Sequence, residues 1–295
     1  MDIFNFFYSF LEKTYNFYVL EIDAILEAFY ITSLVALTVI LIELLFVGWN
    51  NSSLKKLFNP SKSTINDIFS YILYSTSLIV LIAAILSLGI PYFAKTIFFS
   101  ETLFEAGEYL PSWAHLLIYL IFLDFIHYWQ HRLMHRIGPL WEIHKFHHSA
   151  EEMNVITVYR EHPLDKALLA FTSVIPIFLM GRPIGEFFIF FAFYNAIGFF
   201  KHSRLPWTLG WFGKYIIQSP RDHWIHHSRN REHHDKNFAN NFAFWDHIFG
   251  TYYKGKNQNS ELGLNKTDLN KNYLRDLWRV QINFLTKVQK SIKNY

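Results

Sequence analysis

The stretch 131-HRLMHRIGPLWEIHKFHH-148 decides the architecture of this chain, because it places five histidines within eighteen residues. A related cluster, 223-HWIHH-227, follows further along the chain, and His202 stands alone between the two. A helix brings residues three and four positions apart onto one face, so each cluster presents two or three imidazoles in one direction. The pattern predicts helices whose histidine faces converge, with nine candidate imidazoles: His131, His135, His144, His147, His148, His202, His223, His226 and His227.

Convergent imidazoles indicate metal binding, because imidazole is the most common metal ligand and suits iron, zinc, copper and nickel. Eight or nine ligands exceed the roughly four that one tetrahedral ion takes, so the count predicts two metal ions. A lone histidine is more often an ordinary core or surface residue, and we assign His115 and His247 to that class. The sequence leaves the roles of four others open: His127, His162, His233 and His234.

The composition is that of a membrane protein. Of 295 residues, 52% are hydrophobic, 19% aromatic and only 17% charged, whereas soluble domains have about 25% charged residues. The chain has no cysteine, which excludes disulfides, thiolate zinc sites, iron–sulfur clusters and a cysteine nucleophile. Asp2 and Glu12 stand where a signal peptide would be basic, so we expect no cleavable signal. We expect no nucleic-acid partner.

Apolar runs predict about four or five membrane-embedded helices in an all-α bundle. Phe29–Trp49 and Ile65–Ile90 are each long enough to cross a hydrocarbon layer of about 30 Å, which takes about 20 residues. A third run, Trp113–Trp129, leads directly into the first histidine cluster. Two shorter runs, Ala167–Met180 and Ile184–Phe200, flank a Gly181-Arg182-Pro183 turn and form either a membrane hairpin or buried core helices.

The charges of the connections predict on which side of the membrane the histidines lie. Lys55, Lys56 and Lys62 follow the first span. The connection after the second span is acidic, with Glu101, Glu105 and Glu108. Under the positive-inside rule, residues 51–64 lie in the cytoplasm. Counting spans forward then makes the histidine-rich helices a cytoplasmic cap.

We divide the chain into N-terminal membrane helices (1–112), a catalytic domain (113–253) and a basic amphipathic tail (254–295). In the tail, apolar residues recur at helical spacing among lysines and arginines, which predicts an amphipathic helix. It would pack on the protein or on anionic lipid, and we expect the protein. The recurring residues are Leu274, Leu277, Trp278, Ile282, Leu285 and Val288.

Asp124 and His127 continue the stripe of His131 and His135 toward the membrane. A carboxylate near the membrane interior is costly unless it has a partner. We expect Asp124 to accept the second ring N–H of a liganding histidine, which fixes the tautomer of that ring. The alternative is a buried ion pair with an arginine or lysine.

Other classes of metal protein fit the pattern less well. A zinc hydrolase needs a glutamate base in a box such as His-Glu-x-x-His, which is absent. Haem takes at most two axial residues, and soluble di-iron proteins use Glu-x-x-His motifs. A metal-binding or transport protein without redox chemistry would line its spans with histidines or acids, whereas the first span has only Glu43. A membrane-bound pair of metals that activates oxygen fits the ligand count and the apolar setting best.

Several segments resemble the signatures of the fatty acid hydroxylase / sterol desaturase superfamily. They are 124–135 (DFIHYWQHRLMH), 140–149 (LWEIHKFHHS), 219–228 (SPRDHWIHHS), 235–238 (DKNF) and 245–251 (WDHIFGT). The resemblance extends over about residues 110 to 253, and Arg160-Glu161-His162-Pro163 is similar to the branch of bacterial lipid hydroxylases and alkylglycerol monooxygenase. The chain departs from the superfamily at His127, where an aromatic residue is more frequent, and at Asn240-Asn241, where glycines are common.

The resemblance implies a non-haem di-iron oxidoreductase that uses O2 and external electrons to hydroxylate a C–H bond of a membrane lipid. The lipid would be an acyl, alkyl or sterol-like chain, and desaturation is the alternative outcome. All nine candidate histidines match ligand positions, with His202 matching an additional histidine of the superfamily. The chain has neither the His-Pro-Gly-Gly motif of a fused cytochrome b5 nor a glycine-rich dinucleotide fingerprint. Electrons would therefore come from a separate redox protein or a reduced pterin.

Overall fold

The computed structural model of the chain describes residues 8, 12, 22–87, 102–181, 187–255, 261–265 and 269–293. Within these ranges the chain forms helices, joined by loops that contain two isolated β-bridges, Ile217 with Phe242 and Ser228 with Leu262. The all-α prediction is confirmed for this part of the chain. Asp2, Glu101 and the Arg182-Pro183 part of the predicted turn lie outside the described residues.

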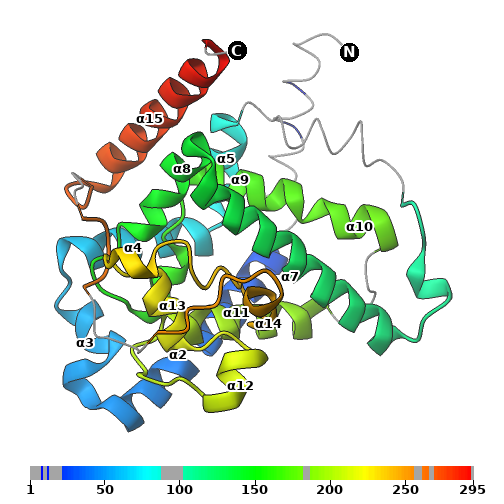
Figure 1. The fold of residues 1–295 in the computed structure, drawn as a ribbon, viewed down its shortest axis with the longest axis horizontal. Coiled ribbons are helices and arrows are strands. Elements are labelled where there is room, and N and C mark those ends of the chain that lie inside the picture. Colours follow the sequence, from blue (N-terminus) through cyan, green and yellow to red (C-terminus); the bar gives the residue numbers. More distant parts are fainter. Residues whose placement is uncertain are drawn as a thin grey trace.

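The helices follow one another as shown in Figure 1. The N-terminal part contains α2 (Ile22–Asn51), α3 (Ser53–Phe58), α4 (Lys62–Ser75) and α5 (Leu78–Leu86). The middle part contains η1 (Ala106–Glu108), α7 (Ser112–Arg136), α8 (Gly138–His148), η2 (Val155–Tyr159), α9 (Pro163–Thr172), α10 (Val174–Met180) and α11 (Phe187–His202). The C-terminal part contains α12 (Gly210–Tyr215), α13 (Pro220–His226), η3 (Arg231–His233), α14 (Phe244–Ile248) and α15 (Tyr273–Lys293).

Helix α2 contains the most apolar candidate for a membrane span, Leu26–Asn51, with a mean hydropathy of 2.4 over an 18-residue window. The one acid of the predicted first span, Glu43, is fully buried. Its carboxylate accepts hydrogen bonds from the backbone N–H of Ser53 (2.6 Å) and of Arg204 (2.6 Å). Glu43 thus joins α2 to α3 and to the segment that follows α11, which explains how the helix tolerates a carboxylate.

The second predicted span, Ile65–Ile90, is bent rather than straight. Helices α4 and α5 meet at Ser77, whose φ of 57° is left-handed, and their axes differ by 92°. The pair is therefore a broken span or a re-entrant loop. Asp67 of α4 is fully buried and pairs with Arg160 at 2.9 Å.

Two helical segments within the described ranges are long and apolar enough to cross a membrane, and the bent pair makes a third if it counts as one span. The second segment is Pro163–Met180, formed by α9 and α10. Helix α7 carries the apolar run Trp113–Trp129 into the first histidine cluster, as the sequence indicates. Four or five membrane-embedded helices and a cytoplasmic cap stay predictions.

Prolines and caps set where the histidine helices begin. Ile137 at the end of α7 is extended, and Gly138-Pro139 then begins α8, because proline lacks an N–H and suits the first turn of a helix. Helix α13 begins at Pro220, and the Ser219 hydroxyl accepts a hydrogen bond from the N–H of Asp222 at 3.1 Å. These local signals orient both histidine-rich helices.

The amphipathic tail forms α15, which packs on the protein beside α8 (Figure 1). The face that it buries differs from the predicted one. Tyr273, Leu277 and Val280 of α15 join a core with residues of α7 and α8. Of the six residues predicted to form the apolar face, four are exposed: Leu274, Trp278, Ile282 and Leu285.

Candidate metal centre

The nine candidate histidines converge in two groups whose ligand atoms lie within 4.8 Å of one another inside each group. The first group has five rings from α7, α8 and α13, and the second has four, from α8, α11, α13 and the residue that follows α13. Neighbouring His147 and His148 point into different groups, while the ring centroids of His148 and His227 lie 4.4 Å apart. The groups are His131, His135, His144, His148 and His226, and His147, His202, His223 and His227.

Hydrogen bonds fix the tautomers of a pair of rings in the first group. His131 donates its Nδ1–H to the carbonyl of Phe238 at 2.8 Å, and His226 donates its Nδ1–H to the carbonyl of Lys236 at 2.8 Å. A carbonyl can only accept, so both neutral rings carry their proton on Nδ1. Their Nε2 atoms, 2.9 Å apart, therefore face each other with lone pairs and no proton between them.

The second group contains the same arrangement. His147 donates Nδ1–H to the carbonyl of Arg160 (3.2 Å), and His202 donates Nδ1–H to the carbonyl of Gly198 (2.8 Å). The Nε2 atoms of these two rings are 3.4 Å apart, again with no proton to share. The Nε2 of His223 is 3.0 Å from that of His202. Facing lone pairs repel each other unless a cation lies between them, so the donor set of each group fits a bound metal ion.

Burial keeps these rings in the form that binds metal. Five of their buried nitrogens have no hydrogen-bond partner: Nε2 of His135, His144 and His148, and Nδ1 of His223 and His227. Burial lowers the pKa of His226 to about 3, and burial together with the neighbouring imidazoles lowers the pKa of His147, His148, His223 and His227 well below the usual value. The rings are therefore neutral at pH 7, as metal ligation requires.

The carboxylate that fixes a histidine tautomer is Asp165, not Asp124. Asp165 Oδ2 accepts Nδ1–H of His144 at 3.0 Å. The prediction for Asp124 was wrong: its carboxylate accepts the backbone N–H groups of Asn241 (3.0 Å) and Phe242 (2.9 Å) and the side-chain amide of Asn241 (2.8 Å). Asp124 thus holds the loop in which Asn240-Asn241 replaces the glycines of the superfamily.

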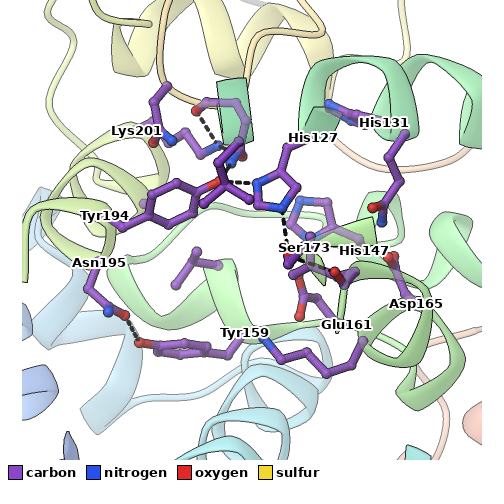
Figure 2. A pocket seen from close by; sticks show the side chains of 18 of the residues that line it. His127, His131, His147, Tyr159, Glu161, Asp165, Ser173, Tyr194, Asn195 and Lys201 are labelled. Atoms are coloured by element: carbon purple, nitrogen blue, oxygen red, sulfur yellow. Dashed lines mark hydrogen bonds between the residues drawn. The ribbon is translucent and has the colours of Figure 1, made fainter. Parts of the chain in front are cut away.

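Of the histidines that the sequence left open, His127 and His162 have partners outside both groups. The ring nitrogens of His127 contact the hydroxyls of Tyr194 and Ser173 (Figure 2). His162 caps α9 by accepting the N–H of Leu164 at 3.2 Å. His233 hydrogen bonds to the Ser228 hydroxyl at 2.8 Å, and His234 lines a cavity described below.

The two histidines that the sequence assigns to ordinary roles also lie outside both groups. His247 is bonded through Nε2–H to the carbonyl of Lys214 at 2.8 Å. His115 is buried near the start of α7, with its ring against Gly107.

A cavity of about 350 Å³ reaches both histidine groups (Figure 2). His131 and His144 of the first group line it together with three rings of the second, His147, His202 and His223. Apolar residues of α7, α9 and α10 form one wall: Leu116, Tyr119, Leu123, Leu169 and Ile177. The wall is built from the helices that carry the apolar runs, so a hydrocarbon chain fits this cavity.

Charged residues that the sequence analysis did not select line the same cavity. They are Glu161, Asp165, Lys166 and Lys201. Burial raises the pKa of the Glu161 carboxyl above its usual range, while Lys201 Nζ donates to the carbonyl and side-chain oxygens of Asn240, each at 2.8 Å. Glu161 belongs to the Arg160-Glu161-His162-Pro163 segment, which is the signal that could have identified it.

A second cavity of about 330 Å³ contacts the first histidine group through different ligands. His135, His148 and His226 line it, together with Trp141, His234 and Asp235. It shares no lining residue with the first cavity, so the five ligands of the first group divide between the two. The Trp141 ring centroid lies 5.0 Å from that of His135 and 5.4 Å from that of His148.

Comparison with known proteins identifies the segment that carries this centre. Residues 116–251 match the fatty acid hydroxylase family. The predicted resemblance is thereby confirmed, and the matched segment contains all nine candidate histidines.

Several curated relatives are lipid or sterol oxygenases by name. The chain is 33% identical over 168 residues to alkylglycerol monooxygenase from Caenorhabditis elegans, covering 55% of this chain and 33% of that protein. It is 28% identical over 193 residues to ornithine lipid hydroxylase OlsE from Rhizobium tropici, covering 64% and 57%. It is 27% identical over 148 residues to methylsterol monooxygenase 2-2 from Arabidopsis thaliana, covering 48% and 55%. The match to the alkylglycerol monooxygenase thus spans about a third of that protein. No solved structure matches the chain significantly.

Proposed function

We propose that this chain is an O2-dependent membrane lipid hydroxylase whose nine clustered histidines hold two iron ions. The observation that carries the proposal is the set of facing Nε2 atoms, His131 with His226 and His147 with His202. In these tautomers neither facing nitrogen carries a proton, so the pair can bind a cation but cannot form a hydrogen bond. The names of the relatives, which are hydroxylases and monooxygenases, support the reaction class.

When bound, the metal pair would supply the oxidising chemistry for a C–H bond that no side chain provides. The residues of the chain bind and orient the substrate. The apolar wall of the first cavity would hold an acyl, alkyl or sterol-like chain beside the rings of both groups. Closure of the cavity by α7, α9 and α11 would exclude bulk water from the reacting carbon.

The electron donor, a separate redox protein or a reduced pterin, would act through the second cavity. That cavity contacts three ligands of the first group and lies apart from the apolar wall. Leu264 also lines it, and filling the cavity with Leu264→Trp should slow reduction of the metals by a chemical reductant such as dithionite, followed by absorbance. Ile177→Trp, which fills the first cavity, should weaken lipid binding and leave the reduction rate unchanged. Equal reduction rates in both variants and wild type would exclude this route.

The test of the function combines metal analysis with lipidomics. Purified protein expressed with sufficient iron should contain about two irons per chain, the number that nine imidazoles predict. Cells that express the wild type should accumulate lipids that carry one additional oxygen, and cells that express His147→Ala should not. A product that has lost two hydrogens instead would establish the desaturase alternative. A protein with one ion or none, and an unchanged lipid profile, would contradict the proposal.

A further inference from the structure

Helix α15 presents a second apolar face in addition to the one that it buries. Tyr273, Leu277 and Val280 pack into the core beside α8. On the other side, five apolar residues recur at spacings of four, four, three and seven, which places them in one row along the helix. Their exposed fractions are 73% for Leu274, 64% for Trp278, 46% for Ile282, 54% for Leu285 and 71% for Ile292.

The surface beside this apolar row is basic. Arg275 and Lys293 each follow a residue of the row by one position, and Lys290 lies on the same flank. The helix has a single acid, Asp276, which is fully buried and accepts the side-chain amide of Asn66 at 3.3 Å. The outward side of α15 therefore combines an apolar row with positive charge that no exposed acid of the helix balances.

The apolar row begins at an element that is itself a candidate for membrane insertion. Phe69 of α4 stacks on Tyr273 at the start of α15, with ring centroids 5.5 Å apart. Ile65, Phe69 and Ile72 of α4 share one helix face and are 40 to 49% exposed. Helices α4 and α5 form a broken span or re-entrant loop, so the start of α15 lies against an element that is a candidate for membrane insertion.

We propose that α15 lies on the surface of an anionic bilayer leaflet. Its apolar row inserts among the acyl chains, about 5–10 Å into the boundary between headgroups and chains. The arginine and lysine side chains extend from the flank to the lipid phosphates, because their long stems allow the charge to stay in the headgroup layer. An exposed row of this kind in water would be an aggregation liability. Its basic flank favours an anionic lipid surface over a neutral apolar partner.

This contact would also hold the metal ligands at a fixed height above the membrane. Helix α15 packs along α8, which carries His144, His147 and His148, and Lys287 Nζ pairs with Glu142 of α8 at 2.5 Å. One helix thus separates the lipid surface from three of the nine candidate ligands. The proposal concerns the surface of the protein and does not depend on the reaction at the metal centre.

Because the chain has no cysteine, single cysteines can be spin-labelled without background. Labels would be placed at Trp278→Cys, Ile282→Cys and Leu285→Cys in the row, and at Thr286→Cys as an exposed control on the adjacent face. In nanodiscs that contain phosphatidylglycerol, the row labels should collide more often with oxygen than with a water-soluble nickel chelate. The label at residue 286 should show the opposite. Gel filtration checks that each variant is folded.

Two further experiments test whether the basic side chains are needed and whether lipid or a second copy of the chain covers the apolar row. In phosphatidylcholine nanodiscs, or in the triple variant Arg275→Gln, Lys290→Gln, Lys293→Gln, the row labels should become more accessible to the nickel chelate. Row labels that are water-exposed in every lipid would overturn the proposal. Labels equally buried with and without anionic lipid would overturn its electrostatic part. Dipolar coupling between the labels of two chains would show that a second copy covers the row instead.

Discussion

Two carboxylates that look alike in the sequence have different tasks in the structure. Asp165 accepts the ring N–H of His144 at 3.0 Å, whereas Asp124 accepts hydrogen bonds from Asn241 and Phe242. We expect Asp165→Asn to weaken metal binding about 10- to 100-fold, as loss of a carboxylate behind a liganding histidine does. Asp124→Asn should mainly lower the melting temperature. Competition with a chelator measures the affinity, and an unchanged affinity in Asp165→Asn would show that the carboxylate does not tune His144.

His202 and His127 provide a matched pair of buried histidines. The Nε2 of His202 is 3.0 Å from that of His223 and 3.4 Å from that of His147, so His202→Ala would leave three rings in the second group. We expect its metal content to fall from about two ions to about one, because three ligands hold the second ion less tightly. His127→Ala should retain both ions, since His127 bonds to Ser173 and Tyr194. If both variants retain about two metal ions per chain, His202 is not a ligand and the centre has eight ligands. Elemental analysis distinguishes the outcomes.

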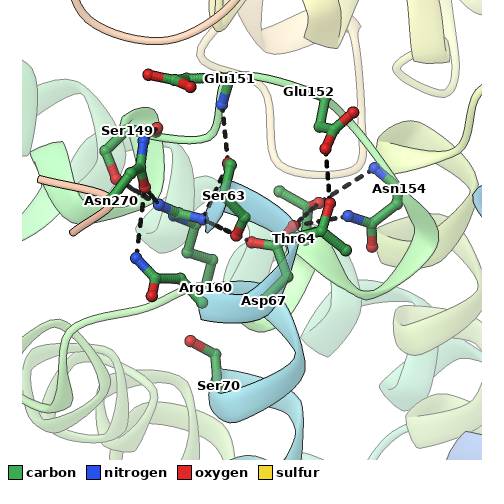
Figure 3. A network of polar contacts seen from close by, with 12 residues as sticks. Ser63, Thr64, Asp67, Ser70, Ser149, Glu151, Glu152, Asn154, Arg160 and Asn270 are labelled. Atoms are coloured by element: carbon green, nitrogen blue, oxygen red, sulfur yellow. Dashed lines mark hydrogen bonds and ion pairs between the residues drawn. The ribbon is translucent and has the colours of Figure 1, made fainter. Parts of the chain in front are cut away.

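At the scale of elements, a buried ion pair joins α4 to the loop after α8. Arg160 is fully buried and donates to Asp67 Oδ1 at 2.9 Å, to the Ser63 carbonyl at 2.8 Å and to the Ser149 hydroxyl (Figure 3). Arg160→Met would leave Asp67 buried without its cation, which costs about 3–5 kcal/mol. Arg136→Met removes an exposed pair with Asp235 (3.7 Å) and should cost at most about 1 kcal/mol. Thermal melting in detergent tests both, and similar losses would mean that the buried pair contributes little.

The sequence predicted the local elements well and their tertiary partners less well. Histidine spacing, Gly138-Pro139 and Ser219-Pro220 are local signals, and α7, α8 and α13 form where they indicate. The bend at Ser77 carries no comparable signal, because serine rarely adopts a left-handed φ. Asp165 and Glu161 lie near the histidines because α9 packs against α7 and α8. This packing cannot be read from the spacing of residues in the sequence. The prediction of the buried face of α15 was wrong for a related reason. The helix has two apolar faces, and the sequence does not show which of them packs against the protein.

At the scale of the whole molecule, burial of the imidazoles makes stability depend on pH. In the unfolded chain these rings titrate near 6.5, whereas in the metal-free fold their pKa values lie far lower, at about 3 for His226. Below about pH 6.5 the unfolded state therefore binds more protons, and stability decreases as the pH falls toward 3. Three carboxyls outside the predicted membrane spans oppose this trend, because burial raises the pKa of Asp222 and Asp246 to about 6 and raises the pKa of Glu161. They are outnumbered by five imidazoles of lowered pKa: His147, His148, His223, His226 and His227.

We therefore expect the melting temperature of the metal-free protein to fall steeply between pH 6.5 and pH 5 and to change little from these groups above pH 7. Added iron should raise it most at neutral pH, because metal binds the neutral rings. A melting temperature that increases on acidification from pH 6.5 would contradict the burial of neutral imidazoles.

The predicted orientation of the molecule rests on its charges and on a contact across the fold. Lys56, in the basic connection after α2, pairs with Glu152 beyond α8 at 2.5 Å, so that connection and the histidine helices meet on the same side. We propose that the connection lies in the cytoplasm, as the positive-inside rule predicts, where reductants would reach the second cavity. We predict that a reporter fused after Tyr295 behaves as cytoplasmic and that one inserted near Glu105 behaves as external. A C-terminal reporter found outside would overturn the cytoplasmic cap and, with it, the route proposed for the electron donor, because both depend on Lys55, Lys56 and Lys62 facing the cytoplasm.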